Sequence, residues 1–202
     1  VNFRLRPIAV TPRPPILMPR YVALLRAINV GGHVVKMDVL RGHFEALGFT
    51  DVSTFIASGN VLFTARAGAA SALEKRIARA LHDALGYPVE TFLRSPAEMA
   101  TAAGHAPFDD VAATDALYVG FLPRALTAAE WRAVQGFAGA TDDFAVNARE
   151  LHWRCRVRSS DSKFSLARFE KALGVPATFR NVTTVRKLAA LLAGGAGRTG
   201  AT

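Results

Sequence analysis

One unbroken run, residues 21–63, constrains the fold more than any other part of the chain: YVALLRAINVGGHVVKMDVLRGHFEALGFTDVSTFIASGNVLF. Residues 21–28 are apolar and have the length and flanks of a buried strand, and two glycines then interrupt the apolar pattern. Apolar residues recur at helical spacing over residues 35–47, and Gly48 stands where helices commonly end. The run therefore predicts a strand, a glycine loop and an amphipathic helix.

The same run ends in a predicted hairpin. Residues 52–56 and 61–64 are β-compatible and flank a short glycine-containing turn at residues 58–60. A second helical pattern covers residues 73–85, and residues 89–93 read as another strand. The order is thus βαββαβ, which predicts a ferredoxin-like split motif.

The remainder of the chain repeats much of this element order. A linker helix and a loop precede a strand, a helix that Thr127 and Glu130 open with a capping box, two paired strands and a helix. A last helix over residues 182–192 stands where a fourth strand would complete the repeat. The sequence therefore predicts an α+β fold of two ferredoxin-like subdomains, an N-terminal βαββαβ unit and a second βαββα unit with a terminal helix.

The expected domain boundaries follow from composition and pattern. Met18, just before the first strand, is the expected natural start, because the residues before it are rich in proline and show no sustained period. The expected divisions are a disordered proline-rich extension (1–19), an N-terminal subdomain (20–95), a linker helix and loop (96–114), a C-terminal α+β subdomain (115–193) and a flexible glycine-rich tail (194–202).

Composition narrows the class of protein. Half of the 202 residues are apolar, which is enough to bury a sizeable core. No apolar run approaches the ~18 residues needed to cross a bilayer, and no signal peptide is recognisable. Cys155 is the only cysteine, so neither an internal disulfide nor a thiolate zinc site can be built from one chain. We expect a cytoplasmic protein without a membrane partner.

The positive charge is unevenly distributed. The chain has 25 basic and 16 acidic residues, a net charge of +9. Four arginines and no acid lie in residues 1–20, while residues 149–193 hold ten basic residues against three acidic ones, a balance of +7. The C-terminal part is therefore expected to present a basic face to a negatively charged partner.

Four separated motifs together resemble one family. LLRAINVGG, the turn at residues 47–49, SGNVLF and RNVTTVRKL occur in the order found in the domain-of-unknown-function 1697 family of bacterial proteins. The resemblance spans residues 20–192 and implies a two-part α+β fold, with no settled activity. Ala27 stands where members of that family usually have glycine, and Ala106 where asparagine is expected.

The glycine loop is the first candidate binding site. Asn29, Gly31 and Gly32 lie between a strand and a helix, so backbone N–H groups there can receive an anion, with Arg26 and Lys36 adding positive charge. The alternative is that the glycines only permit a tight reversal. The specific nucleotide-binding patterns GxGxxG and GxxxxGK[ST] are absent.

Two further segments carry candidate ligand-binding residues. Ser58, Gly59 and Asn60 present a hydroxyl and an amide on a turn, although turn chemistry alone explains the trio. Arg180 and Asn181 precede the last helix, where Asn181 is expected to cap and Arg180 to attract a phosphate or carboxylate. Lys163, at the start of the preceding helix, is expected to join them.

The strand at residues 151–158 alternates two kinds of side chain. Cys155 and its apolar neighbours point one way and Arg154, Arg156 and Arg158 the other, ~6.6–6.8 Å apart along the strand. This spacing matches successive phosphates of an extended nucleic acid, whereas the alternative is a charged edge strand. The aromatic RNP1 pattern is missing, so an ordinary RRM is excluded.

No catalytic or metal site emerges. The five histidines show no paired ligand spacing, so we expect no metal, no cofactor and no assigned catalytic residue. The leading hypothesis is a binding module for a phosphate-bearing or other anionic partner, with nucleic acid among the candidates. The alternative is an enzyme acting on a small anionic substrate in a cleft between the two halves. The oligomeric state stays open.

Overall fold

The computed structural model describes residues 18–29, 32–162 and 164–194. These residues form two four-stranded antiparallel sheets and six helices, so the predicted α+β class with two repeated units is confirmed. The proline-rich extension before Met18 and the glycine-rich tail after Gly194 lie outside the described residues, as do Gly31 and Lys163.

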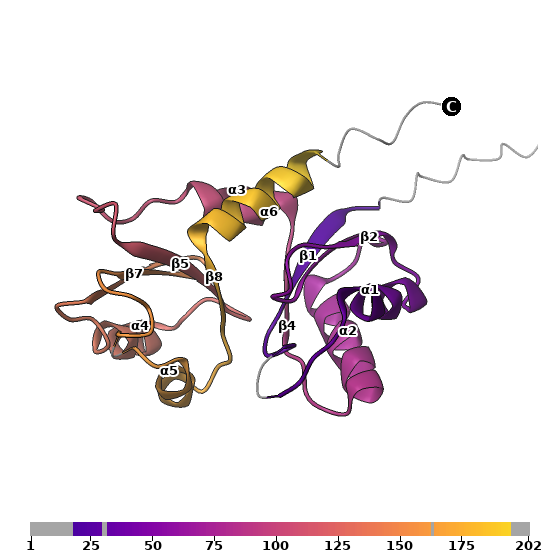
Figure 1. Ribbon diagram of the computed structural model, residues 1–202, viewed down its shortest axis with the longest axis horizontal. Coiled ribbons are helices and arrows are strands. Elements are labelled where there is room, and N and C mark those ends of the chain that lie inside the picture. Colours follow the sequence, from indigo (N-terminus) through magenta and orange to yellow (C-terminus); the bar gives the residue numbers. More distant parts are fainter. Residues whose placement is uncertain (1–17, 30–31, 163, 195–202) are drawn as a thin grey trace, which may run out of the picture.

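The first half contains the strands and helices that the sequence predicts. Its sheet has the strand order β2-β3-β1-β4, in which β1 is central and pairs with β3 and β4. The helices α1 and α2 cover one face of this sheet (Figure 1). In chain order the elements are β1 (Arg20–Leu25), α1 (Met37–Ala46), β2 (Thr50–Thr54), β3 (Asn60–Thr64), α2 (Ala70–Leu85) and β4 (Thr91–Arg94).

The second half has the same strand order, β6-β7-β5-β8. Its sheet carries α4 and α5, while α3 and α6 lie side by side and bridge the two halves (Figure 1). In chain order the elements are α3 (Pro96–Gly104), β5 (Ala116–Phe121), α4 (Ala128–Gln135), β6 (Asp142–Asn147), β7 (Glu150–Cys155), α5 (Leu166–Leu173), β8 (Thr178–Asn181) and α6 (Val182–Gly194).

The strand β8 corrects the sequence prediction, which placed no fourth strand in the second half. β8 is only four residues long and pairs antiparallel with β5. Its two buried side chains, Thr178 and Arg180, are polar, so the segment lacks the apolar alternation that signals a strand. The second half is therefore a complete βαββαβ unit, and α6 follows it as an additional element.

Local signals set several helix ends as expected. Thr127 caps α4, and Glu130 completes the predicted capping box. Gly86 and Gly174 end α2 and α5 in the left-handed conformation, at φ 80° and 65°.

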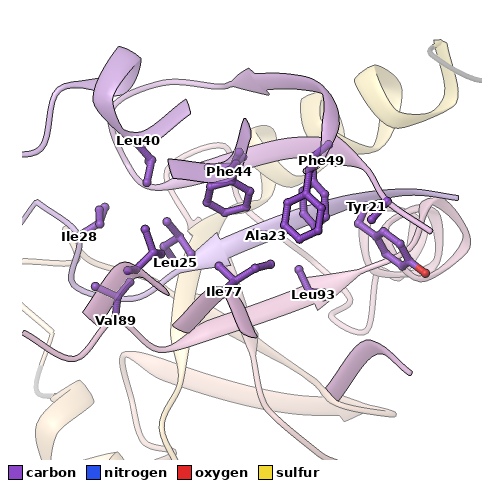
Figure 2. Close-up of a cluster of buried hydrophobic side chains, with 14 of the residues drawn as sticks. Tyr21, Ala23, Leu25, Ile28, Leu40, Phe44, Phe49, Ile77, Val89 and Leu93 are labelled. Atoms are coloured by element: carbon purple, nitrogen blue, oxygen red, sulfur yellow. The ribbon is translucent and has the colours of Figure 1, made fainter. Parts of the chain in front are cut away.

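The core of the first half lies between its sheet and the helices α1 and α2. Side chains on β1 alternate, so that Tyr21, Ala23 and Leu25 point into this core (Figure 2). They pack against Leu40 and Phe44 of α1 and against apolar side chains of α2, β3 and β4. Burial of this apolar face holds both helices on the sheet.

A second core joins the two halves. Val22 and Leu24, on the other face of β1, pack with Phe121 of β5 and with Val185 and Leu188 of α6. A third cluster lies between the second sheet and the helices α4 and α5. Both faces of β1 are thus buried, and the middle core belongs to both halves.

Candidate functional site

A cleft of about 460 Å³ lies between the two halves. Its volume falls within the range of small-molecule sites. The first half contributes the loop after β1 and the turn between β2 and β3, and the second half contributes β8 and the start of α5. The lining residues are Leu25, Arg26, Ala27, Ile28, Asn29, Ala57, Ser58, Leu166, Thr178, Phe179 and Arg180.

The guanidinium of Arg180 joins the two halves at this cleft. Arg180 is 8% exposed, and its Nη2 donates to the carbonyl oxygens of Leu25 (2.9 Å) and Ser58 (2.8 Å) in the first half. Its Nε donates to Oδ1 of Asn60 (2.7 Å), and its Nη1 donates to Oγ1 of Thr178 (2.8 Å) and to the Phe179 carbonyl (2.9 Å). Every one of these acceptors is a neutral oxygen.

Two other buried arginines differ from Arg180 in their partners. Arg94 is completely buried and forms an ion pair with Glu150. Arg154 forms an ion pair with Asp143, 2.9 Å from Nε to the carboxylate. Within the described residues, no carboxylate lies within ion-pair distance of Arg180.

Burial has a measurable effect on the charge of Arg180. Loss of solvation lowers the pKa of Arg180 to about 10, which leaves the guanidinium protonated at neutral pH. A charge that is poorly solvated interacts more strongly with another charge at the same distance than a charge in water does. The wall of the cleft therefore carries a positive charge that its hydrogen bonds satisfy but do not neutralise.

Arg26 also spans the two halves. Its Nε and Nη2 donate to the two carboxylate oxygens of Glu170, at 2.8 and 2.6 Å, in a bidentate pair. Glu170 accepts a further bond from the backbone N–H of Ala177. The charges of Arg26 and Glu170 cancel, so Arg180 sets the net charge of the cleft.

Two hydroxyl groups complete the polar lining. Ser58 Oγ accepts a bond from Nδ2 of Asn60 (2.8 Å), just as Thr178 Oγ1 accepts one from Arg180. Each hydroxyl thereby keeps its own proton for donation. The side-chain amide of Asn29, in contrast, bonds to the backbone. Its Nδ2 donates to the carbonyl oxygens of Val35 and Ala57, and its Oδ1 accepts from the Val35 N–H.

The two loops of the first half have unusual backbone conformations at the cleft. Ala27 and Ile56 adopt φ 60° and 50°, which is uncommon for residues other than glycine. Gly59 has φ 73°, and a Cβ there would lie 2.6 Å from the Ile28 side chain. Strained non-glycine residues are frequent at binding sites.

Comparison with known proteins establishes the family. A model of the family described as "Protein of unknown function (DUF1697)" matches residues 18–152, more than half of the chain. The chain belongs to the DUF1697 family. The family resemblance predicted from the motifs is thus confirmed. The matched segment includes LLRAINVGG and SGNVLF and ends before Glu170 and Arg180.

A solved structure supports the fold of this DUF1697 protein. The conserved bacterial protein SP0830 from Streptococcus pneumoniae has a TM-score of 0.68 and 24% sequence identity. The alignment covers 88% of this chain and 99% of that one. No curated protein matches the chain.

The structure brings some of the predicted ligand-binding residues of this DUF1697 protein together. Arg26, Asn29, Ser58 and Arg180 line the cleft, and Asn60 lies beneath it, completely buried. Gly59 allows the close approach of the turn to the loop after β1.

Other predicted residues lie apart from the cleft lining. Lys36 is exposed before α1, and Gly32 occupies a reversal at φ 88°. Asn181 accepts a bond from the backbone N–H of Thr183 (2.9 Å), as expected for a cap of the last helix. Gly31 and Lys163 lie outside the described residues.

Sequence reasoning missed Thr178, Phe179 and Glu170. Side chains alternate between two faces over residues 178–181, with Thr178 and Arg180 on one face, and this alternation was the available signal for β8. Nothing local marks Glu170, because its partner Arg26 is 144 residues away along the chain.

The three arginines predicted to bind nucleic acid occupy different environments. Arg154 is buried and pairs with Asp143 and, more distantly, with Asp115 at 3.8 Å. Arg156 shares Asp143 with it, and Arg158 is exposed. The strand was predicted over residues 151–158, but β7 ends at Cys155, so Arg156 and Arg158 are exposed beyond its end while Arg154 is covered. The three side chains therefore do not form a continuous exposed row.

The described ranges contain neither a candidate metal site nor a helix that could span a membrane. They contain no group of three or more histidine, cysteine or carboxylate side chains placed to hold a metal ion. None of their helices combines the length and apolarity needed to cross a membrane.

Proposed function

We propose that this protein binds a small phosphate-bearing or other anionic ligand in the cleft between its two halves. The observation that carries the proposal is the Arg180 guanidinium, which is buried in the cleft wall and bonded to neutral oxygens alone. A buried charge is normally paired, as those of Arg94 and Arg154 are. A bound anion would supply the missing negative charge.

The hydrogen bonds to such a ligand would come from other groups. All five N–H bonds of Arg180 already have acceptors in the protein, so Arg180 would act through its charge. The hydroxyls of Ser58 and Thr178 retain protons to donate, and Arg26 Nη1 has no acceptor among the described residues. These three donors suit the oxygens of a phosphate or carboxylate.

The contacts of the cleft favour binding over catalysis. A serine nucleophile needs an adjacent base, and the lining within the described residues includes no histidine and no carboxylate side chain. Nucleic acid is less well supported than a small ligand, because Arg154 and Arg156 are already paired with carboxylates. A compact anion fits the cleft volume and its single unneutralised charge.

A charge substitution inside the cleft tests the proposal. Thr178→Asp places a carboxylate next to Nη1 of Arg180, where it occupies the position of the ligand's charge. We expect this variant to melt at a higher temperature than the wild type and to bind anions at least about tenfold more weakly. Thr178→Asn matches the shape of the aspartate without its charge and replaces the lost hydroxyl donor with an amide N–H, so it should keep most of the affinity.

The measurement is a thermal-shift screen followed by calorimetry. Inorganic phosphate, sugar phosphates, nucleoside monophosphates and citrate are the probes, since a ligand that binds only the native form raises its melting temperature. The proposal is wrong if a probe binds Thr178→Asp as tightly as it binds Thr178→Asn, or if none of the probes binds the wild type.

A further inference from the structure

A second, smaller cavity of about 40 Å³ lies beneath the loop that follows α3. Its walls come from that loop, from the strands β5 and β7, and from the first turns of α6. It shares no lining residue with the cleft. Its polar side chains are those of His105, Tyr118, His152 and Arg186.

His152 is the buried polar residue of this cavity. Its side chain projects from β7 and is 4% exposed, and its Nε2 has no hydrogen-bond partner among the described residues. The neighbours on the same face of β7 have charged partners, because Glu150 pairs with Arg94 and Arg154 with Asp143, although the geometry at Arg154 Nε is not that of a hydrogen bond. A buried polar atom without a protein partner is rare in folded proteins, so we expect a water or another small hydrogen-bonding group beside it.

The charges around His152 are positive or neutral. On β7, Glu150 and Arg154 are already in ion pairs. His105, from the end of α3, meets the His152 ring edge-on at 4.7 Å between centroids, and α6 contributes the exposed Arg186. The parts of β5 and β6 beside His152, Val119 and Ala145, are apolar.

Burial and the nearby His105 together lower the pKa of His152 to about 4, so its imidazole is neutral at neutral pH. A neutral imidazole can donate one hydrogen bond and can take up a proton when an anion arrives. Within the described residues, no carboxylate lines the cavity, which disfavours a metal cation and favours an anion.

The dimensions limit the size of the guest. One water needs about 10–15 Å³ of such a cavity, so a volume of about 40 Å³ has room for about three or four heavy atoms, which fits the carboxylate group and the first carbon of a short chain. The remaining walls are apolar and include Pro107, Phe108 and Val182. A carboxylate group with a short hydrocarbon chain matches both the polar and the apolar parts.

We propose that this cavity is a binding site for a short-chain monocarboxylate, held between the His152 and His105 imidazoles and the Arg186 guanidinium. The carboxylate accepts the hydrogen bond of the unpartnered His152 nitrogen and pairs with Arg186. Its hydrocarbon part contacts Phe108 and Val182. The site is independent of the cleft and does not rest on the function proposed for it.

The probes are propionate and its neutral isostere propionamide. Propionate should raise the melting temperature and shift the side-chain nitrogen resonances of His152 in long-range ¹H–¹⁵N spectra, whereas propionamide should do neither. Binding should tighten several-fold from about pH 7.5 to about pH 5.5, because the anion favours protonated His152.

Three variants locate the site. Arg186→Gln removes an exposed charge without disturbing the core and should weaken propionate binding about three- to tenfold. Lys187→Gln removes an exposed charge next to it in sequence but outside the cavity lining, and should leave binding unchanged. Thr178→Asp, which changes the cleft, should also leave it unchanged.

Several outcomes would overturn the proposal. One is an unchanged His152 resonance at saturating propionate, which would mean that water alone fills the cavity. Equal responses to propionate and propionamide would exclude recognition of charge. Loss of propionate binding in Thr178→Asp, with retention in Arg186→Gln, would place the propionate in the cleft.

Discussion

At the scale of single residues, backbone conformation distinguishes the loops around the cleft. Ala27 holds φ 60° at the position where the family resemblance leads one to expect glycine, and Ile56 holds φ 50° in the facing turn. A side chain makes the left-handed region less favourable by roughly 1–2 kcal/mol. The two loops are therefore held in place by their contacts, among them the bonds that Arg180 donates to Leu25 and Ser58.

Replacing Ala27 with glycine should relieve this strain. We expect Ala27→Gly to raise the free energy of unfolding by about 0.5–1 kcal/mol, as measured by urea denaturation. Ala78→Gly, in the interior of α2, is the matched control and should lower it by about 1 kcal/mol. A decrease for Ala27→Gly would show that the conformation carries no strain.

At the scale of elements, β7 shows how far sequence reasoning reaches. Its alternation was predicted, with Trp153 and Cys155 on one face and His152 and Arg154 on the other. The sequence could not reveal that the polar face is also buried, because the α3–β5 loop and α6 that cover it are distant in sequence. Helix ends were predictable because signals such as Thr127 and Gly174 act within a few residues.

In the candidate cleft, too, local sequence patterns were predictable and contacts between distant parts of the chain were not. Arg26 and Ser58 were predicted because they accompany a glycine loop and a turn, both of which are local patterns. Glu170 was not, since its partner Arg26 is 144 residues away in the other half, and Thr178 was not, since the strand β8 was not predicted.

The buried face of β7 predicts a pH dependence. His152 has a pKa of about 4 in the folded state against 6.5 as its ordinary value, so the unfolded chain binds more protons between these values. The contribution of neutral His152 to the free energy of unfolding is therefore fully present above about pH 6.5. It is lost as the pH drops towards 4, by up to about 3 kcal/mol.

Urea unfolding at several pH values checks this dependence. His152→Gln should flatten the decrease between about pH 6.5 and about pH 4.5, while His82→Gln, at an exposed position on α2, should preserve it. An unchanged slope in His152→Gln would assign the loss of stability to other groups.

The pairing of β5 with β8 depends on a close contact. A Cβ at Gly120 would lie 2.6 Å from the ring of Phe179, the residue opposite it on β8. We expect Gly120→Ala to lower the free energy of unfolding by about 1–3 kcal/mol, because the ring must move. Phe179→Leu removes the ring, so the double variant should lose less stability than the two single variants added together; strict additivity would contradict this contact.

At the scale of the whole molecule, the two repeated units share a core and a buried ion pair. The middle core contains side chains of β1 and of β5, and buried polar contacts such as Arg94 with Glu150 cross the same boundary. Burial lowers the pKa of Arg94, and the charge of Glu150 opposes that effect. Neither half can separate without exposing both apolar surface and an unpaired charge.

Removing one charge at this boundary should weaken both halves equally. Glu150→Gln leaves Arg94 buried without a counter-charge, and we expect the free energy of unfolding to fall by about 3 kcal/mol. Glu45→Gln, in the exposed pair with Arg41, should change it by less than about 1 kcal/mol.

Hydrogen exchange distinguishes one cooperative unit from two. In Glu150→Gln, the amides of β1 and β7 should lose protection by the same amount. Faster exchange confined to β7 would mean that the halves unfold separately.

The position of α6 has a consequence for biosynthesis. Val185, Leu188 and Leu192 of α6, together with side chains of α3 and β5, cover the face of the first sheet that α1 and α2 leave open. During translation, β1 therefore keeps part of this apolar side uncovered until residues 182–194 have emerged. Exposed apolar surface of this kind on a nascent chain favours aggregation, and the docking of α6 removes part of it.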